Sequence, residues 1–320
     1  MQAVASAPGK VILFGEHFVV KDQPAIAVAI SLRARATVTL IEDRRIRIKS
    51  KNLNLSADYP VPPHDDKNPL YSLAYVANLV LNKAGTNKGV QVDIDSEIPP
   101  SAGMGSSAAV SVATVAATAK ALGLDLTLEE ISKLAFEAEK IVHGRPSGID
   151  NTIATFGGAI AYRKSEGFLK LNVDFSNITL ILADTGKPRS TGQLVKRVLD
   201  LYEAFPTVLE PLYYAAGRLS VEAAKLMERG DWEAVGALMN VNHGLLSAIG
   251  VSTLELEQII HVARRAGALG SKLTGAGGGG YALILCKRGE EEKIVEEVRK
   301  VSSKVIITQV ASEGLVTFTM

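Results

Sequence analysis

The segment best suited to binding chemistry is "SEIPPSAGMGSSAAVSVA", residues 96–113, in which prolines, glycines and serines precede an alanine-rich stretch. Alternating apolar and polar residues over 89–95 predict a half-buried strand before it. The run of alanines over 106–122 predicts a helix after it. Free backbone N–H groups and the positive end of a helix dipole meet at such a junction, which makes it a natural site for an anion such as phosphate. The glycines alone are equally well explained by a tight connection.

Three charged side chains elsewhere, Lys10, Glu139 and Asp150, each have an ordinary structural interpretation. Lys10, in "APGK", is otherwise a surface lysine. Glu139 falls near the end of a predicted helix, where a glutamate is usually a solvated charge, yet the helix dipole disfavours an anion there and hints at another partner. Asp150, in "PSGIDN", is otherwise a helix cap, which is also the usual role of Ser106 and Ser107.

Two known phosphate-binding loops fit this segment poorly. A nucleotide P-loop needs Gly-Lys followed by Ser or Thr, whereas the last glycine here is followed by two serines. The dinucleotide-binding fingerprint is nearer, because Gly103, Gly105 and Ala108 satisfy G-x-G-x-x-A between a strand and a helix. That fingerprint requires a second parallel strand after the helix, but the chain continues with "GLDLTLEE" and another predicted helix. A dinucleotide-binding domain is therefore disfavoured.

The elements that would position these residues follow from hydrophobic patterning. Short strands are expected at "KVILFG", "AIAVAI", "RARATVTLIE" and "RIRIKS", and helical spacing covers 68–83. Thr127, with Glu130 three residues later, forms a capping box that predicts the start of a helix ending at Gly144. Strands at "AIAYRK" and "ITLILADT" precede a mostly helical stretch over 191–265. From "GSKLTGAGGGGYALILC" to the last residue, the pattern predicts a strand, a glycine-rich turn, a strand, a helix and further strands.

The composition is that of an ordinary globular protein. The 35 Lys and Arg against 34 Asp and Glu leave a net charge of +1, which indicates neither a nucleic-acid partner nor an anionic membrane. The uncharged stretch 98–119 contains prolines, glycines, serines and threonines, so we do not expect it to span a membrane. The single cysteine, Cys286, lies in the apolar run "YALILC" and is expected in a buried strand. No signal peptide is expected. A chain of 320 residues suits two domains, and a shift in composition at 165–178 is the best candidate for the boundary between them.

Three motifs, in order along the chain, resemble those of the galactokinase, homoserine kinase, mevalonate kinase and phosphomevalonate kinase superfamily. They are "APGKVILFGEH" at 7–17, "IPPSAGMGSSAA" at 98–109 and "LTGAGGGG" at 273–280. Within the superfamily, "GEHFVV" and "EAEKIVHGRPSGIDN" are similar to mevalonate kinases, and the compact length is similar to the archaeal members. Met104 stands where the family usually has Leu, a substitution that conserves volume.

The resemblance implies a two-domain α+β fold with the active site in the cleft between the domains. The first domain is expected to be an α+β domain of the ribosomal protein S5 domain 2 type that binds the nucleotide, over 1–170. The second is expected to be a ferredoxin-like α+β domain, over 171–320. The order of predicted strands and helices is compatible with this fold.

The resemblance also implies a site for ATP and Mg2+. Phosphoryl transfer needs a phosphate cradle, a divalent metal, cationic charge and a group that orients the acceptor hydroxyl. By resemblance, Asp150 is the catalytic carboxylate and Lys10 is its cationic neighbour beside the transferred phosphate, while Ser107 and Glu139 hold Mg2+. The loop expected to bind ATP comprises Pro99, Pro100, Ser101, Ala102, Gly103, Met104, Gly105, Ser106, Ser107 and Ala108.

The implied substrate is mevalonate. Glu16 and His17 match positions that line the mevalonate pocket, and Ser147, Thr185 and Gly277 are further candidates for substrate contact. The four consecutive glycines that begin at Gly277 would weaken a regular strand or helix, which indicates a close approach of the backbone to a neighbour. The implied activity is ATP-dependent phosphorylation of the C5 hydroxyl of (R)-mevalonate to 5-phosphomevalonate, in the cytoplasmic mevalonate pathway of isoprenoid biosynthesis. A homodimer is one option for the assembly.

Two other hypotheses stay open on the sequence. The chain could be another small-alcohol kinase of the superfamily, acting on phosphomevalonate or homoserine. It could also be a non-catalytic ligand sensor on the same fold, although a sensor does not need all four of Lys10, Ser107, Glu139 and Asp150. A decarboxylating relative is disfavoured because "HGRPSGIDN" follows the kinase pattern.

Overall fold

The computed structural model describes residues 2–64, 67–100, 102–144, 146–188 and 191–319. The chain divides into two compact units. Unit 1 comprises Met1–Lys10, Ala29–Gly157 and Ala311–Met320, and unit 2 comprises Val11–Val28 and Gly158–Val310. Two long strands, β1 (Gln2–Phe14) and β2 (Ala25–Ile41), each contribute residues to both units.

Unit 1 is built on a mixed sheet with the strand order β12–β1–β2–β5–β3–β4. Its further strands are β3 (Arg45–Ser50), β4 (Leu55–Pro60), β5 (Gly89–Ser96) and β12 (Val316–Thr319). β3 pairs with β5 in parallel, whereas the β2–β5, β3–β4 and β1–β12 pairs are antiparallel. In β5 the buried Val92 and Ile94 alternate with the more exposed Asp93 and Asp95. This period of two is the pattern of a sheet with one apolar face.

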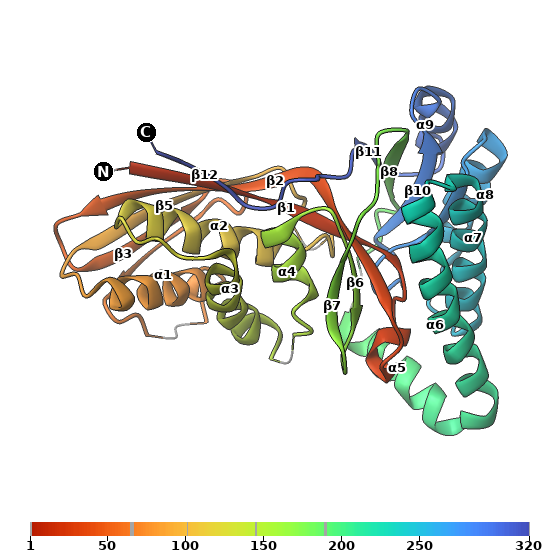
Figure 1. Cartoon of the computed structure of the whole chain (residues 1–320), viewed down its shortest axis with the longest axis horizontal. Helices are drawn as coiled ribbons and strands as arrows, with labels where there is room; N and C mark the ends of the chain where they lie inside the picture. The colour runs from red at the N-terminus through yellow and green to blue at the C-terminus, as the bar shows by residue number, and fades with distance from the viewer. Residues whose placement is uncertain (1, 65–66, 101, 145, 189–190, 320) are drawn as a thin grey trace. The chain divides into compact units, whose positions relative to one another are not determined.

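Helices α1 to α4 cover one face of this sheet (Figure 1). They are α1 (Tyr71–Ala84), α2 (Ser106–Ala121), α3 (Leu128–His143) and α4 (Ile149–Phe156). α2 is buried around most of its circumference and contacts the other three, because its alanines let neighbouring helices approach closely. The predicted capping box of Thr127 and Glu130 is present at the start of α3, and Gly144 ends that helix.

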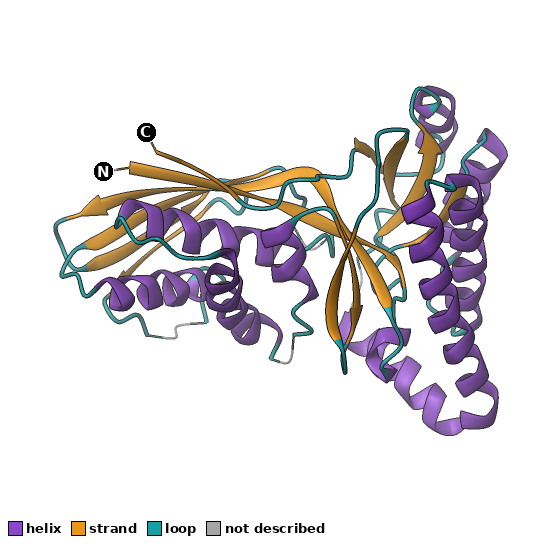
Figure 2. Ribbon diagram, in the orientation of Figure 1, coloured by secondary structure: helices purple, strands orange, loops and turns teal. Residues whose placement is uncertain are grey.

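Unit 2 contains an antiparallel sheet with the order β11–β8–β10–β9, packed against helices (Figure 2). The strands are β8 (Ile178–Asp184), β9 (Gly270–Leu273), β10 (Tyr281–Lys287) and β11 (Lys304–Thr308). The helices are η1 (Phe18–Lys21), α5 (Thr191–Ala204), α6 (Pro206–Arg229), α7 (Trp232–Ala248), α8 (Leu254–Ala266) and α9 (Glu291–Arg299). A hairpin of β6 (Ala159–Arg163) and β7 (Gly167–Leu171) pairs with the first residues of β2. Cys286 lies fully buried in β10, as predicted.

The strands at the start of the chain are longer than the sequence pattern indicates. The two short strands expected at "AIAVAI" and "RARATVTLIE" are one continuous strand, β2, and β1 begins well before "KVILFG". The apolar run of β2 is interrupted near Arg33, whose guanidinium donates hydrogen bonds to the carbonyl oxygens of Ser6 (2.8 Å) and Gly314 (2.5 Å). The strand continues without interruption through this polar position, so the prediction of a break there was wrong.

The compact units are not the contiguous ranges 1–170 and 171–320 expected for the domains. The division falls after Gly157, residues 11–28 join unit 2, and the last residues return to unit 1. The return has a clear cause, because β12 pairs with β1 and Leu315 N–H donates to the Thr155 carbonyl oxygen over 3.0 Å. In the part of the chain that the structure describes, no helix combines the length and apolarity needed to cross a membrane.

Candidate active site

The glycine-rich loop of unit 1 ends at the N-terminus of α2. Gly103 and Gly105 adopt left-handed backbone angles, with φ of 70° and 68°, and Gly105 is the N-cap of α2. The loop packs against β1, since Lys10 N–H donates to the Met104 carbonyl oxygen over 2.9 Å. A Cβ on Gly9 would lie only 2.9 Å from that same oxygen, so the close packing requires glycine there. The backbone geometry therefore favours an anion at this helix N-terminus.

Lys10 and Asp150 form an ion pair directly beside this loop. Lys10 Nζ lies 3.3 Å from Asp150 Oδ1 and donates to the Gly103 carbonyl oxygen over 3.1 Å. A Cβ on Gly105 would lie 3.0 Å from Lys10 Cγ and 3.7 Å from Asp150 Oδ2. The Asp150 side chain is 32% exposed, so its carboxylate is held in place yet stays accessible to a ligand.

Asp150 and the two serines are not helix caps. Gly148 is the N-cap of α4, and Asp150 lies inside the first turn, where the helix dipole favours a carboxylate. The N-cap of α2 is Gly105, and no side-chain hydrogen bond caps this helix. The capping interpretation of Ser106, Ser107 and Asp150 was therefore wrong.

Ser107 instead contacts Glu139, late on α3. Ser107 Oγ donates to Glu139 Oε1 over 2.6 Å, and Glu139 is only 3% exposed, so it is not a solvated surface charge. His143 Nε2 lies 3.6 Å from Glu139 Oε2. Burial raises the pKa of Glu139 and the nearby Asp150 carboxylate raises it further, while the Ser107 hydrogen bond opposes the change. A buried carboxylate next to a hydroxyl and a second carboxylate is an oxygen-rich donor set that fits Mg2+.

Two pockets of unit 1 meet at these residues. One, of about 230 Å³, is mostly apolar and extends from the helix N-terminus to Leu53, Pro69 and Leu73. It also includes Ser106 and Ser107. The other, of about 220 Å³, is lined by Glu139, His143, Pro146, Ser147, Gly148, Asp150 and Asn151. An apolar pocket, a glycine-rich helix start and a carboxylate pocket thus follow one another within one unit.

The residues of the predicted ATP loop do not all face a ligand. Gly103 is exposed, whereas the other residues of the loop that are buried cannot face a ligand; these are Ala102, Met104 and Ala108. Pro99 is half-buried, and Pro100 is exposed and lines the apolar pocket. Ser101 and its expected contact with ATP lie outside the described residues. The sequence interpretation missed the apolar pocket itself, because its lining residues come from ordinary loops and helix starts with no motif.

In unit 2, the "GEH" turn contacts β9 and the residues that follow it. The Glu16 carboxylate forms an ion pair with Lys272, and both side chains are almost completely buried. His17 Nε2 lies 2.8 Å from the Ala276 carbonyl oxygen. Glu16 Oε1 accepts from Lys272 Nζ, and His17 Nδ1 is buried with no hydrogen-bond partner among the described residues.

The three weaker candidates for substrate contact have local structural partners. Ser147 Oγ accepts from Ile149 N–H over 3.3 Å and lines the carboxylate pocket. Thr185, which follows β8, accepts from Lys187 N–H over 3.3 Å. Gly277 has φ of 73°, and a side chain there would collide with the Val251 carbonyl oxygen. The close approach indicated by the glycine run is therefore, at this position, a contact inside unit 2.

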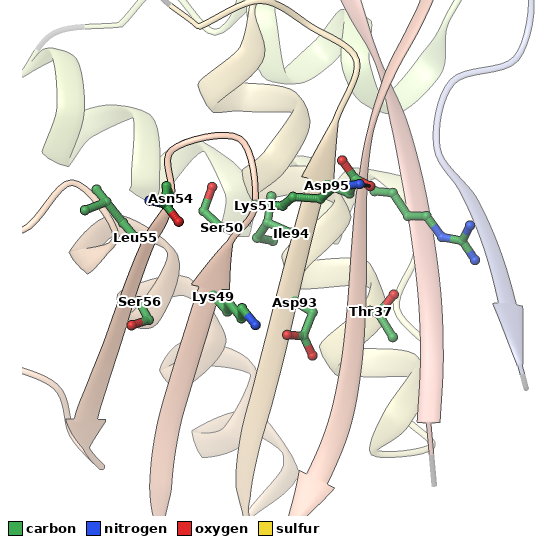
Figure 3. Close-up of a pocket in the computed structure, with 11 residues that line it drawn as sticks. Thr37, Lys49, Ser50, Lys51, Asn54, Leu55, Ser56, Asp93, Ile94 and Asp95 are labelled. Atoms are coloured by element: carbon green, nitrogen blue, oxygen red, sulfur yellow. Dashed lines mark hydrogen bonds and ion pairs between the residues drawn. The ribbon is translucent and has the colours of Figure 1, made fainter.

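A larger hollow, of about 560 Å³, lies on the sheet of unit 1 and includes none of the predicted site residues (Figure 3). Its polar side chains come from neighbouring strands, and Lys49 and Asp93 point toward each other in Figure 3. Lys51 and Asp95 form an exposed ion pair of 3.0 Å across it. An exposed ion pair of this kind contributes little energy, and the residues with the predicted chemistry lie at the start of α2 instead.

Comparison with known proteins is consistent across three kinds of similarity. The model of the GHMP kinases N terminal domain matches residues 71–158, and that of the GHMP kinases C terminal region matches 223–304. The mevalonate kinase of Aeropyrum pernix is 41% identical, covering 98% of this chain and 97% of its own. The crystal structure of L. major mevalonate kinase with R-mevalonate superposes with a TM-score of 0.83 at 32% identity, covering 95% and 94%. That of the Methanococcus jannaschii mevalonate kinase gives 0.86 at 26% identity, covering 96% and 98%.

Proposed function

We propose a reaction for this chain from one premise: the chain belongs to the GHMP kinase family. It is a kinase that phosphorylates mevalonate, and the transfer goes from ATP to the C5 hydroxyl of (R)-mevalonate. The observation that carries the site assignment is the Lys10–Asp150 ion pair of 3.3 Å beside the glycine-rich start of α2. The same proposal assigns the enzyme to the cytoplasm.

The nucleotide follows the succession of pockets in unit 1. The base fits the apolar pocket beside Leu53 and Leu73, where burial of an aromatic ring is favourable. The phosphates then lie at the N-terminus of α2, whose backbone N–H groups and dipole favour negative charge. This order brings the terminal phosphate toward Asp150, whose carboxylate belongs to the next pocket.

Ser107 and Glu139 would hold Mg2+. Their oxygen atoms are 2.6 Å apart, and the Glu139 carboxylate is buried where a cation would compensate its charge. When bound, Mg2+ neutralises phosphate charge and orients the transferred group. The hydrogen bond from Ser107 keeps the Glu139 carboxylate directed toward the phosphate loop before the nucleotide arrives.

Asp150 and Lys10 act on the acceptor and the transferred group. The Asp150 carboxylate accepts a hydrogen bond from the C5 hydroxyl and orients its oxygen for attack on the γ-phosphorus of ATP. Asp150 takes the hydroxyl proton as the new oxygen–phosphorus bond forms and the bond from the γ-phosphorus to the bridging oxygen breaks, which releases ADP. The Lys10 ammonium lies on the phosphate side of Asp150, hydrogen-bonded to Gly103, and stabilises negative charge on the transferred phosphoryl group. Because both side chains are already paired, little reorganisation is needed during the transfer.

A coupled assay of ADP release tests this function. The purified chain is given ATP and Mg2+ with mevalonate, phosphomevalonate, homoserine or galactose in separate reactions. We expect turnover with mevalonate and a product whose phosphate is on the C5 oxygen by 31P and 13C NMR. Turnover of phosphomevalonate or homoserine with none of mevalonate would replace the substrate while keeping the kinase. Phosphate on the tertiary C3 oxygen would overturn the proposed acceptor.

A further inference from the structure

Helix α4, which carries Asp150, has little of its own to hold its first turn in place. It contains only eight residues, Ile149–Phe156, and no side-chain hydrogen bond caps it at Gly148. Helices shorter than about 12 residues are marginal in water, so contacts with the rest of a protein keep them folded. The position of the Asp150 carboxylate therefore depends on the contacts that fix the first turn of α4.

The residue after Asp150 makes such a contact with α3. Asn151 is 5% exposed, and its Nδ2 donates to the Ser132 carbonyl oxygen over 3.2 Å and to Ser132 Oγ over 2.8 Å. A carbonyl oxygen only accepts hydrogen bonds, so the amide nitrogen, and not the amide oxygen, must face Ser132. Two directional bonds thus fix the orientation of the Asn151 side chain and join the first turn of α4 to α3.

Ser132 lies on the face of α3 that also carries Glu139. The two residues are seven positions apart, which is about two helical turns, and both belong to the buried side of α3. Glu139, Asp150 and Asn151 all line the carboxylate pocket of about 220 Å³. One face of α3 therefore supplies the buried carboxylate of this pocket and also the attachment point of the helix that supplies the other carboxylate.

The orientation of Asn151 determines the direction of Asp150, because consecutive side chains leave an α-helix about 100° apart. With Asn151 bound to α3, Asp150 Oδ1 lies 3.3 Å from Lys10 Nζ, and Oδ2 lies 3.7 Å from the place that a Cβ on Gly105 would take. A carboxylate about 5–6 Å from the helix axis moves about 2 Å when the helix rotates by about 20°. A shift of that size would break the ion pair, and misplacement by about 1 Å can cost about 10²-fold in rate.

An amide is a costly side chain for a contact that only fills space. Asn151 Oδ1 is buried and has no hydrogen-bond partner among the described residues. An unpaired buried acceptor destabilises a protein, whereas an apolar side chain of similar size has no such atom. An apolar side chain, however, forms no directional bond and would not fix the rotation of α4. Orientation of the helix therefore explains why an amide is present at this position.

We propose that Asn151, through its two hydrogen bonds to Ser132, is the positioning residue that fixes the rotation of α4 and so holds the Asp150 carboxylate beside Lys10 and the start of α2. The proposal rests on the proposed function, since Asp150 is the group that orients the acceptor hydroxyl. Asn151 acts on the reaction through Asp150, so its loss should lower kcat and leave the binding of ATP unchanged.

Steady-state kinetics of two variants separate position from stability. Asn151→Leu fills a similar volume and removes both hydrogen bonds to Ser132, so kcat with mevalonate should fall about 10- to 100-fold, with the KM for ATP within about twofold of wild type. The matched control is Thr155→Val, in the same helix, which removes the buried hydrogen bond of 2.7 Å from Thr155 Oγ1 to the Asn151 carbonyl oxygen and keeps the contact with α3. Its kcat should stay within about threefold of wild type. Equal kcat losses for the two variants would give Asn151 a purely structural role, and the proposal would be wrong.

A milder variant keeps the proposal testable if Asn151→Leu does not fold. Ser132→Ala removes the hydroxyl partner at 2.8 Å and keeps the bond to the Ser132 carbonyl oxygen. Its kcat should fall about three- to tenfold, again with little change in the KM for ATP. A kcat equal to that of wild type would contradict the proposal.

A double-mutant cycle tests whether Asn151 acts through Asp150. In the Asp150→Asn background no carboxylate is left to position, so Asn151→Leu should lower the remaining kcat by less than about twofold. A loss as large as that in the wild-type background would mean that Asn151 affects the reaction by another route, and it would overturn the proposal.

Hydrogen exchange of the ligand-free protein keeps this inference separate from the proposed function. Thr152 N–H donates to the Gly148 carbonyl oxygen over 3.3 Å in the first turn of α4. Its exchange, followed by 1H–15N NMR, should be at least about tenfold faster in Asn151→Leu than in Thr155→Val, with the amides of α1 unchanged. A chain that does not phosphorylate mevalonate but shows this local change would lose the proposed function and keep the positioning role of Asn151. Equal exchange of Thr152 in both variants, or equally faster exchange in α1, would overturn that role whatever the substrate.

Discussion

Each unit contains one lysine–carboxylate pair at its candidate site, and the two pairs differ in their exposure. In unit 1 the Lys10–Asp150 pair spans 3.3 Å, and Asp150 has 32% of its side chain exposed. In unit 2 the Lys272–Glu16 pair has side chains 0% and 2% exposed. The carboxylate of the pair in unit 1 is therefore accessible from solvent, whereas the carboxylate of the pair in unit 2 is not.

This difference separates a pair that can react from a pair that can only hold structure. A group that takes a proton from a substrate must touch it, so the role proposed for Asp150 requires its remaining exposure. The fully buried pair of unit 2 lies next to the turn that carries His17, so it can hold that turn in position. Exposure, and not residue type, is thus the reason for which we propose the Lys10–Asp150 pair as the reactive one.

The largest effect is expected for the exposed pair. Asp150→Asn keeps the size of the side chain and removes its ability to accept a proton, so turnover should fall by about 10²–10⁴-fold while ATP binding is retained. Steady-state kinetics with mevalonate and calorimetric titration with ATP measure the two properties. Asp95→Asn, in the exposed ion pair with Lys51, is the matched control and should behave as wild type. Turnover near that of wild type for Asp150→Asn would remove this residue from the mechanism.

For the stability of the protein the order should be reversed, because the buried pair should contribute more to it than the exposed pair. Lys272→Met leaves the Glu16 charge buried and should lower the free energy of unfolding by about 3–5 kcal/mol. Lys10→Met leaves Asp150 in contact with water and should cost about 1 kcal/mol or less. Urea denaturation followed by circular dichroism gives both values. Equal losses for the two variants would contradict the distinction drawn from exposure.

A smaller effect is expected at the buried carboxylate of unit 1. Glu139→Gln should raise the Mg2+ concentration for half-maximal rate by about tenfold, because one charged oxygen ligand is lost, and change the KM for mevalonate little. Titration with Mn2+ in the presence of ATP, followed by electron paramagnetic resonance, measures the metal affinity independently of activity. Glu137→Gln, at a partly exposed position two residues earlier, is the control and should leave the metal affinity unchanged. An unaltered Mn2+ affinity in Glu139→Gln would exclude Glu139 as a ligand.

The smallest effect concerns the acid sensitivity of unit 2. Burial lowers the pKa of His243 to about 4, although Glu257 opposes the change. In the unfolded state His243 therefore binds a proton near pH 6.5, whereas in the folded state it binds one only near pH 4. The free energy of unfolding thus falls as the pH decreases through this interval. Between pH 7 and pH 5, wild type should lose about 1–2 kcal/mol more than His243→Gln. The control, His261→Gln at an exposed position, should follow wild type, and identical slopes for all three would disprove the assignment.

Local sequence patterns predicted the elements around the site well. The capping box at Thr127, the helix after the glycine-rich loop and the buried strand around Cys286 are all present. The α+β class and kinase activity followed from three motifs in order, and the comparisons with known kinases support them. These features depend on residues close together in the chain or on motifs with fixed spacing, which a single sequence carries in full.

Other features depend on which distant residues meet, and no local pattern records that. The sequence contained Ser107 and Glu139, but only packing of α2 against α3 brings them within 2.6 Å and excludes the serine from capping. No local sequence feature distinguishes Lys272 from other lysines in strands. The fold buries it against Glu16, 256 residues earlier in the chain. The sequence by itself determined the helices, most strands and the identity of the reactive groups, because backbone preferences and hydrophobic periodicity act over a few residues. Tertiary structure alone decided burial, pairing and protonation, because desolvation and charge contact arise only when distant segments pack together.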